Sequence, residues 1–335
     1  MRKLNIAIVG ATGLVGSKFL EILNERQIPI NNLYLYASER SSNKTIIFQN
    51  KEYKVITLAS ENIINQKIDY ALFSAGEKIS RSFAQDFINI GAVVIDNSSA
   101  FRMDSETPLI VPEVNSYAFS TKDKLISNPN CSTIQCMSPL KALHKLFELK
   151  RVDYTTFQAV SGSGMKGIKD LEETQKGNPP AFYPHSIFNN CLPHIGDFID
   201  NNYTKEEIKM VKESQKILNL PNLEVSATCV RVPINNSHSI EIDAEFKKTV
   251  DINLVKETLS NYPGITLLDS PSENVYPLAT IASGTDSVYV GRIRVDLFDT
   301  KKLHFFSVAD NIRKGAATNA VQILEVYETK LNLSK

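Results

Sequence analysis

The sequence predicts an α/β protein with a doubly wound, mostly parallel sheet at the N-terminus and a second, α+β domain with a large, mainly antiparallel sheet. Three observations favour it. A glycine-rich turn joins a strand pattern to a helix pattern near residue 10, strand and helix patterns then alternate to about residue 130, and long strand patterns dominate afterwards. A chain of 335 residues also exceeds the usual size of a single hydrophobic core.

The first domain begins with the apolar run "LNIAIVG" and the amphipathic stretch "LVGSKFLEILNER", which predict a strand, a turn and a helix. Further strand patterns follow at "NLYLYAS", "IDYALFSA" and "AVVIDNSS", with the helical pattern "SRSFAQDFINI" between the last two. This alternation is typical of a parallel sheet. The segment "TIIFQNKEYKVITL" instead predicts a hairpin that turns at Asn50.

The second domain begins at the helix pattern "STIQCMSPLKALHKLFEL", where Pro139 should kink or restart the helix because proline has no N–H to donate. The strands "VDYTTFQAVS", "LEVSATCVRVPI", "SHSIEIDAEF" and "SVYVGRIRVDL" follow. The last helix pattern, "NIRKGAATNAVQILEVYETK", could pack back on the first domain. We therefore expect a first domain over residues 1–130, completed by a helix at 312–332, and a second over residues 131–311.

The composition excludes several classes of function. Hydrophobic residues make up 42% and charged residues 22%, and Lys plus Arg and Asp plus Glu both total 37, so the formal net charge is zero. No broad positive field is available to attract nucleic acid or a membrane surface. We also expect a cytosolic protein, because no signal peptide or membrane-length apolar run is visible. The four cysteines lack paired zinc spacing, so we expect free thiols and no metal site.

Gly10, Gly13 and Gly16 form a G-x-x-G-x-x-G pattern between the first strand and the first helix. Backbone amides and the positive end of the helix dipole can hold a pyrophosphate at such a turn. The position of the glycines favours a dinucleotide site in a Rossmann-type domain, with a tight turn that binds nothing as the alternative.

The ribose contact of such a site is expected near the end of the second strand, at "ASERSSNK". Glu39 could bind a ribose diol and favour NAD, whereas Arg40 with Ser38 and Ser41 could bind a 2′-phosphate and favour NADP. We prefer NADP because several donors suit a dianion. A solvated polar turn is the remaining alternative.

Cys131 in "SNPNCSTIQC" falls at the start of a predicted helix. The unpaired amides and the dipole of a first helical turn stabilise a thiolate over a thiol, which favours a nucleophile. Asn130 could cap this helix or direct its amide to an oxyanion beside the sulfur. Cys136 should face another side and pack. A buried structural thiol is the alternative for Cys131.

His238 has the most suitable neighbours of the five histidines. The period of two in "SHSIEIDAEF" puts its side chain on the apolar face of a strand, near the beginning of that strand. Arg231, seven residues earlier, fits a site for a carboxylate substrate. A hydrogen-bonded core histidine is the alternative.

Three further segments carry weaker signals. Gln158 ends a strand before the glycine-serine turn "SGSG" at residues 161–164, which could be a second anion or cofactor loop or a flexible connector. Glu206 and Lys209 share one helical face, as solvated surface pairs usually do. Arg102 follows the end of a predicted strand, and its position alone does not indicate a function.

Taken together, the segments resemble the aspartate-semialdehyde dehydrogenase family over nearly the full chain. The matching elements, in family order, are "GATGLVG", "ASERSSNK", "DNSSAFR", "SNPNCSTIQ", "FQAVSGSG", "EEIKM", "RVPINNSHS" and "KGAATNAVQI". The resemblance implies that Cys131 is the nucleophile and His238 the acid/base, with Gln158 orienting the acyl group. It also implies that Arg231 binds the substrate α-carboxylate, Glu206 its amino group, and Arg102 with Lys209 the phosphate. The NADP contacts it implies are Thr12, Gly13, Leu14, Val15, Arg40, Ser41, Ser161, Gly162 and Asn319.

The implied reaction converts L-aspartyl 4-phosphate and NADPH reversibly into L-aspartate 4-semialdehyde, phosphate and NADP through a cysteine thioester. In that scheme His238 returns a proton as the thiohemiacetal collapses. The family makes precursors of lysine, threonine, methionine and diaminopimelate, and its second domain is catalytic and forms a homodimer or a dimer of dimers.

Two rival functions remain open from the sequence. One is another phosphorylating aldehyde dehydrogenase, such as N-acetyl-glutamyl-phosphate reductase or glyceraldehyde-3-phosphate dehydrogenase. Glu206 discriminates against these, because a carboxylate suits a free ammonium group. The other rival is a non-catalytic dinucleotide-binding sensor, which has no use for Cys131 together with His238.

Overall fold

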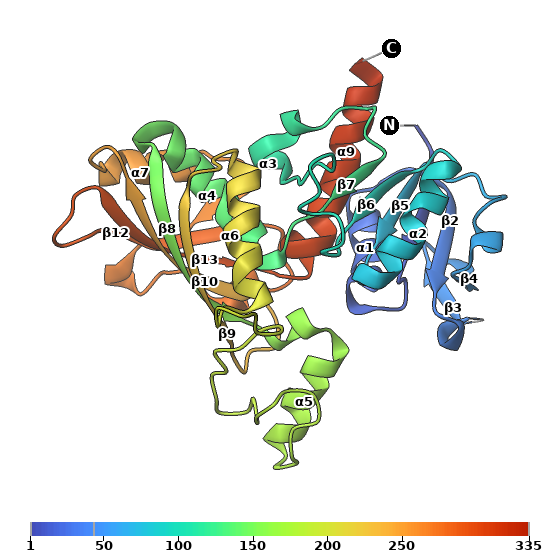
Figure 1. Ribbon diagram of the computed structural model, residues 1–335, viewed down its shortest axis with the longest axis horizontal. Helices are drawn as coiled ribbons and strands as arrows, with labels where there is room; N and C mark the ends of the chain where they lie inside the picture. The colour runs from blue at the N-terminus through green and yellow to red at the C-terminus, as the bar shows by residue number, and fades with distance from the viewer. Residues whose placement is uncertain (1, 43, 334–335) are drawn as a thin grey trace. The chain divides into compact units, whose positions relative to one another are not determined.

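The chain folds as two units, each built on its own sheet (Figure 1). The computed structural model describes residues 2–42 and 44–333. The first unit is Met1–Pro129 with Ala316–Lys335, and the second is Asn130–Gly315. None of the described helices is both long enough and apolar enough to span a bilayer.

The sheet of the first unit has the strand order β3-β4-β2-β1-β5-β6-β7. All its neighbouring strands are parallel except β3 and β4, which form the predicted hairpin at the edge of the sheet and turn at Gln49 and Asn50. The strands are β1 (Leu4–Val9), β2 (Ile30–Ala37), β3 (Thr45–Phe48), β4 (Lys51–Thr57), β5 (Tyr70–Phe73), β6 (Val93–Asp96) and β7 (Leu125–Ser127). The helices are α1 (Leu14–Glu25), α2 (Glu77–Asn89), α3 (Pro112–Asn115) and α9 (Thr318–Leu333).

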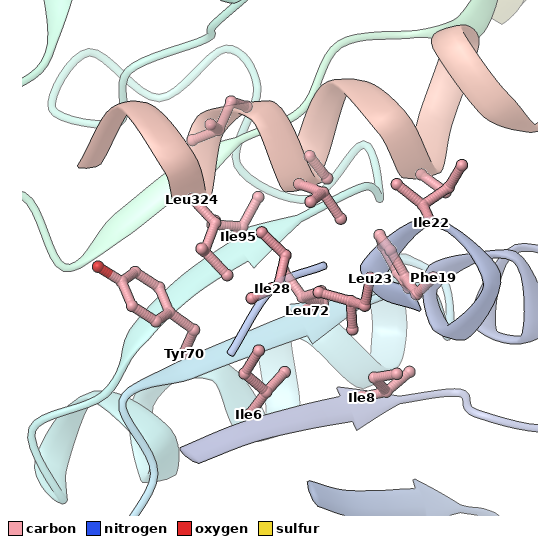
Figure 2. Packing of buried hydrophobic residues seen from close by; sticks show 14 of the residues in the cluster. Ile6, Ile8, Phe19, Ile22, Leu23, Ile28, Tyr70, Leu72, Ile95 and Leu324 are labelled. Atoms are coloured by element: carbon pink, nitrogen blue, oxygen red, sulfur yellow. The ribbon is translucent and has the colours of Figure 1, made fainter. Parts of the chain in front are cut away.

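Helices cover both faces of this sheet, which is the doubly wound arrangement that the sequence predicts. Figure 2 shows one face, where Phe19 of α1 and Leu324 of α9 pack with Ile6 and Ile8 of β1. On the other face, Phe87 of α2 packs in a second apolar cluster. Burial of these side chains is the main force that fixes α1, α2 and the C-terminal helix on the sheet.

The sheet of the second unit has the order β11-β12-β13-β10-β8-β9. Its pairs are antiparallel except β11 with β12 and β8 with β9, so the predicted fold class is confirmed. The strands are β8 (Leu149–Gln158), β9 (Glu224–Arg231), β10 (His238–Phe246), β11 (Ile265–Leu267), β12 (Val288–Val295) and β13 (Lys302–Ala309). The helices are α4 (Cys131–Phe147), α5 (Met165–Gln175), α6 (Lys205–Leu218), α7 (Ile252–Ser260) and α8 (Ala279–Ala282).

One face of this sheet is covered and the other is more open. Helix α4 packs on β8, β10 and β13, while α6 lies against β9 and α7 against β11 and β12. Alternate residues of β10, beginning with His238, are buried on the covered face, as the period of two predicts. The residues between them, such as Glu241 and Asp243, stay partly exposed.

Helix α4 runs without interruption through Pro139, so the predicted restart at this residue is wrong. Proline leaves the carbonyl of the residue four positions earlier without its helical donor. That residue is Gln135, and its carbonyl oxygen accepts a hydrogen bond of 3.2 Å from the hydroxyl of Ser307 on β13. The neighbouring strand therefore supplies the hydrogen bond that the helix lacks.

The last helix differs from the prediction at its beginning. The expected helix at 312–332 is an α-helix only from Thr318, and Arg313–Ala317 form a π-helical turn before it. The amide of Gly315 donates to the carbonyl of Asp310, five residues earlier, at 2.9 Å. The carboxylate of Asp310 also accepts from the amides of Ile312 and Arg313, and this satisfies donors that a regular helix start would leave free.

The contact between Ser307 and Gln135 predicts a coupled effect on stability. Replacing Ser307 by Ala leaves a buried carbonyl without its donor, and we expect a loss of about 1–3 kcal/mol of unfolding free energy. With Pro139→Ala the helix regains its own N–H, so the cost of Ser307→Ala should fall. A double-mutant cycle measured by urea unfolding gives this coupling, and equal costs in both backgrounds would contradict it.

Candidate active site

Cys131 is the first residue of α4, and Asn130 is the residue that caps this helix. The Asn130 Oδ1 atom accepts from the amides of Ser132 at 2.9 Å and Thr133 at 3.4 Å. Cys131 as a residue is partly exposed. The positive end of the helix dipole stabilises a thiolate at this position. The capping role considered for Asn130 is thus seen directly.

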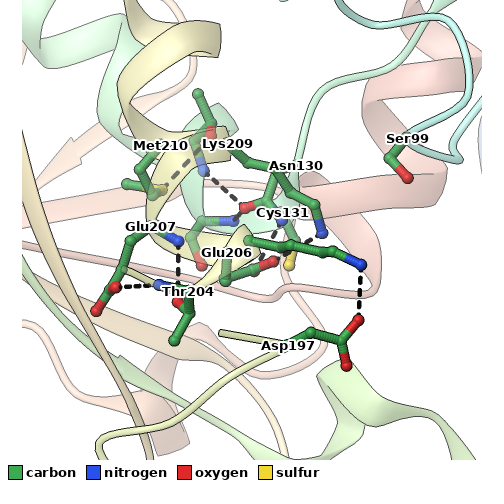
Figure 3. Close-up of polar contacts among 12 residues, drawn as sticks. Ser99, Asn130, Cys131, Asp197, Thr204, Glu206, Glu207, Lys209 and Met210 are labelled. Atoms are coloured by element: carbon green, nitrogen blue, oxygen red, sulfur yellow. Dashed lines mark hydrogen bonds and ion pairs between the residues drawn. The ribbon is translucent and has the colours of Figure 1, made fainter. Parts of the chain in front are cut away.

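Two carboxylates of α6 also hold Asn130. Its Nδ2 donates to Glu206 Oε1 at 2.8 Å, and its backbone amide donates to Glu213 Oε2 at 2.7 Å (Figure 3 shows the Glu206 contact). The amide considered for an oxyanion contact therefore gives a hydrogen bond to Glu206. Glu213 was not among the predicted site residues. The only feature of the sequence that could have pointed to Glu213 is its spacing of seven residues from Glu206, which places both side chains on one face of α6.

His238 begins β10 and lies with its ring against the sulfur. The Nε2 atom is 3.3 Å from Cys131 Sγ, and Nδ1 accepts a hydrogen bond of 3.0 Å from the backbone amide of Ala159. Burial and then the nearby Arg231 lower the pKa of His238 to about 3, although Glu206 opposes this. The imidazole is therefore neutral at ordinary pH. The fold brings Cys131 and this ring together from positions 107 residues apart.

Arg231 and Gln158 lie side by side because β8 and β9 pair in a register that sets them opposite each other. The Arg231 guanidinium is buried, and its Nη1 donates to the carbonyl of Ala159 at 2.6 Å. Its Nε has no hydrogen-bond partner within the described part of the chain. A buried cation with an unused donor is suited to an anionic ligand, because burying such a group without a partner is costly.

Glu206 is buried, whereas its pairing with Lys209 on one helical face is typical of an exposed surface pair. Burial alone would raise the pKa of Glu206, but Lys209 at 3.0 Å and hydrogen bonds from Asn130 and Gln158 lower it to about 2. The folded pKa lies below the ordinary 4.5. Its ionised form therefore stabilises the fold above about pH 4.5, and this contribution is lost as the pH falls through the folded pKa.

The "SGSG" turn approaches the same residues. A Cβ at Gly162 would lie 3.0 Å from Arg231 Nη1 and 3.1 Å from His238 Cε1, so any larger residue would crowd both side chains. Ser161 Oγ accepts from the Nδ2 of Asn311 at 3.0 Å. Gly162 was predicted to contact the cofactor. The structure adds that it packs closely against Arg231 and His238, which the sequence did not indicate.

Cys136 is buried, and burial raises the pKa of its thiol well above the ordinary value. This agrees with the predicted packing role and leaves Cys131 as the thiol beside a histidine. Among the described residues, no group of histidines, cysteines and carboxylates is arranged to hold a metal ion.

Most of the predicted dinucleotide residues lie in the first unit, whereas Ser161 and Gly162 lie in the second. Gly10 has φ +90°, and a Cβ at Gly16 would be 2.1 Å from the Gly10 carbonyl oxygen, so the turn packs against the start of α1 as a dinucleotide turn does. The first turn of α1 has no acidic side chain that would repel a phosphate. Thr12 Oγ1 and Ser41 Oγ are 3.4 Å apart, which joins the glycine turn to the predicted ribose loop. These residues fit a dinucleotide.

The other predicted contacts at this loop differ in exposure. Ser38 and Arg40 are exposed, and Leu14 and Val15 are partly buried at the start of α1. Gly13 is the cap of α1 and has no side chain to occupy the first amides. The helix start is therefore open to an anion from the backbone side.

Arg102 and Asn319 are both buried in the first unit and share Asn128 as a partner. Arg102 Nε donates to the Asn128 carbonyl at 3.0 Å, and its Nη2 donates to the Asn97 carbonyl at 2.6 Å. The Asn319 amide donates to Asn128 Oδ1 at 2.7 Å and to the Ile110 carbonyl at 2.9 Å. Both side chains thus have a structural role that does not by itself exclude the predicted ligand contacts.

Comparisons with known proteins agree with this geometry. The family profile described as "Semialdehyde dehydrogenase, NAD binding domain" matches residues 5–122, and "Semialdehyde dehydrogenase, dimerisation domain" matches residues 140–314. Aspartate-semialdehyde dehydrogenase of Aquifex aeolicus is 49% identical, with 96% of this chain and 97% of that protein covered. The enzyme of Bacillus subtilis is 43% identical, with 99% of both covered.

Solved structures give the same result. Aspartate semialdehyde dehydrogenase II from Vibrio cholerae, in a structure described as complexed with ASA, is 40% identical and matches with a TM-score of 0.92. The match covers 98% of this chain and 99% of that one. A probable aspartate-semialdehyde dehydrogenase from Pseudomonas aeruginosa is 28% identical, with a TM-score of 0.89 over 97% and 98% of the two chains. The chain belongs to the aspartate-semialdehyde dehydrogenase family.

Proposed function

We propose that the protein reduces L-aspartyl 4-phosphate to L-aspartate 4-semialdehyde with NADPH, reversibly, through a thioester on Cys131. One observation carries this proposal: the Cys131 sulfur at a helix N-terminus, 3.3 Å from His238 Nε2, in the same unit as a buried arginine and a buried carboxylate. The substrate has an α-carboxylate and an α-ammonium group. Arg231 and Glu206 supply the complementary charges. The names of the relatives support the same substrate.

Each residue of the site has a separate role in the proposed reaction. The Cys131 thiolate attacks the acyl phosphate carbon, and the leaving phosphate departs with the C–O electron pair. We assign Gln158 to orienting the resulting acyl group, and Arg102 with Lys209 to binding phosphate. When bound, the reduced nicotinamide supplies the hydride that the thioester carbon accepts.

The NADP assignment rests on Arg40, which is exposed and forms no ion pair with any residue that the structure describes. A free guanidinium next to Ser38 and Ser41 suits a 2′-phosphate, whereas Glu39 would suit the unphosphorylated ribose. The family profile establishes a nicotinamide dinucleotide domain, and NADP over NAD is our finer proposal. A related enzyme from Candida albicans is described with NADP.

We further propose a homodimer formed through the β-rich second unit, which the family profile describes as a dimerisation domain. The partly exposed face of its sheet is the natural candidate for the interface. A dimer of dimers and a cytosolic location remain predictions. Light scattering after gel filtration gives the oligomeric state, and cell fractionation gives the location.

The direct test of the proposed function is phosphate-dependent reduction of NADP with aspartate 4-semialdehyde. We expect activity in the native protein and its loss, by at least about 10³-fold, in Cys131→Ala, because the covalent route needs the thiolate. Cys191→Ala is the matched control, since Cys191 is an exposed thiol outside this cluster. Activity that persists in Cys131→Ala would exclude the thioester route, and activity only with an N-acetylated substrate would favour the rival reductase.

Glu206→Gln tests recognition of the substrate ammonium group. The variant keeps an oxygen for Asn130 and Gln158 but removes the charge, so we expect the KM for the semialdehyde to rise about 10- to 100-fold. The KM for NADP should stay nearly constant. Glu257→Gln is the matched control, because it removes the same charge at an exposed residue of α7. Equal KM values for the semialdehyde in the native protein and in Glu206→Gln would remove Glu206 from the substrate site.

Arg40→Ala tests the cofactor assignment. The loss of a charge-assisted contact to the 2′-phosphate should raise the KM for NADP about 10- to 100-fold and leave the KM for NAD unchanged. Both constants come from steady-state assays with the two cofactors. If the native protein uses NAD as well as NADP, or if Arg40→Ala affects both cofactors equally, the assignment fails.

A further inference from the structure

We propose that Glu213 is a positioning residue for the reaction: its buried carboxylate holds the backbone amide of Asn130 and thereby sets the Cys131 sulfur in its reactive place. The inference rests on the function proposed above. Glu213 lies on α6 with 1% of its surface exposed, which leaves too little for contact with a substrate. Its part in turnover is therefore indirect, through the residue that precedes the nucleophile.

The start of α4 departs from the usual way of holding a helix cap. In a capping box, the side chain of the third helical residue accepts from the backbone amide of the cap residue. The third residue of α4 is Thr133, and its hydroxyl donates to Met210 Sδ on α6 at 3.5 Å. The backbone amide of the cap, Asn130, is buried and needs an acceptor from another element.

Glu213 is that acceptor. Its Oε2 accepts from the Asn130 amide at 2.7 Å, a short distance that is typical of hydrogen bonds to carboxylates. Glu207 on the same helix makes the local version of this contact, because it accepts from the amide of Thr204, the cap of α6, at 2.7 Å. Both carboxylates thus hold the backbone amide of a helix cap. Only the Glu213 contact acts on the helix that begins with Cys131.

Glu206 holds the side chain of the same cap residue. It lies seven residues before Glu213, so both carboxylates are on one face of α6. The Asn130 Nδ2 donates to Glu206 Oε1 at 2.8 Å, while its backbone amide donates to Glu213 (Figure 3 shows the Glu206 contact). A residue held at its side chain and at its backbone cannot rotate about either contact. Because Cys131 follows directly, its backbone is fixed as well.

Cys131 has little room to compensate for a shift of Asn130. A Cβ at Gly315 would lie 3.0 Å from the Cys131 Cβ, so the π-helical turn packs closely on one side of the cysteine. The sulfur also lies 3.3 Å from His238 Nε2. Attack on an acyl carbon depends on the distance and direction of the sulfur, and a displacement of about 1 Å can lower a rate about 100-fold. Loss of the Glu213 contact should therefore slow the reaction.

The first test varies the reach and the charge of residue 213 separately. Glu213→Gln keeps an oxygen in place and removes the charge, whereas Glu213→Asp keeps the charge and withdraws the oxygen by about 1.5 Å. We expect kcat for phosphate-dependent NADP reduction to stay close to native in Glu213→Gln and to fall about 10- to 100-fold in Glu213→Asp. The KM for the semialdehyde should stay nearly constant. Equal kcat values in the two variants, or a higher kcat in Glu213→Asp, would overturn the proposal.

Glu207 is the matched control for a purely structural effect. It is also a buried carboxylate of α6, and it accepts from the backbone amides of Thr204 and Cys229. Glu207→Asp shortens the side chain by the same amount, so it should lower the stability measured by urea unfolding and leave kcat unchanged. An equal fall of kcat in Glu207→Asp and Glu213→Asp would show a structural role alone and contradict the proposal.

The second test needs no substrate. The pH dependence of iodoacetamide labelling of Cys131, with the exposed Cys191 as a reference in the same sample, reports the surroundings of the sulfur in the free protein. We expect the midpoint for Cys131 to rise by about half a pH unit in Glu213→Asp, because a displaced sulfur loses part of the field of the helix end. It should stay native in Glu213→Gln. An unchanged midpoint in Glu213→Asp would overturn the proposal.

The two tests separate this proposal from the proposed function. If NADP reduction is absent in the native protein while the labelling midpoints change as expected, the proposed function fails and the positioning of the sulfur by Glu213 stands. If the native protein is active and neither kcat nor the midpoint responds to Glu213→Asp, the role of Glu213 alone is disproved.

Discussion

The site depends on one interaction, the way in which α6 and α4 together hold Asn130. The side chain of Asn130 caps α4, its amide nitrogens donate to two buried carboxylates of α6, and the next residue carries the sulfur. Because the cap sets the direction of the first turn, the sulfur is placed at the positive helix end and against the His238 ring. Loss of this junction would free the helix start and move the Cys131 sulfur away from its neighbours.

Ala159 is the second residue on which the arrangement of the site depends, because its amide and its carbonyl bind His238 and Arg231. It follows β8, whose register places Gln158 beside Arg231 and Phe157 beside Ser239. Strand pairing thus brings three segments that are distant in the chain to the end of one strand. The covered face of the sheet supplies burial, and burial makes each polar contact strong and each unpaired donor costly. The register in which the strands pair, more than the conformation of any loop, therefore determines where the site residues lie.

The sequence alone predicted the parts of the fold that local patterns encode. The glycine turn, the edge hairpin, the helix that starts at Cys131 and the inward face of His238 all follow from spacing and residue type. The contacts that it missed are long-range. Glu206 looked like a surface residue because its burial depends on β8 and β9, and Pro139 is tolerated because Ser307 lies opposite. Strand β13 at Lys302–Ala309 was not recognised as a strand, Glu213 is marked only by its helical spacing from Glu206, and no local signal marks the Ala159 amide.

The central claim is that the Cys131 sulfur is ionised by its position at the start of α4. The pH dependence of iodoacetamide labelling, followed by mass spectrometry for each cysteine of the native protein, tests this claim most directly. We expect half-maximal labelling of Cys131 at least about one pH unit below that of the exposed Cys191. The same midpoint for both thiols, or a higher midpoint for Cys131, would contradict the account.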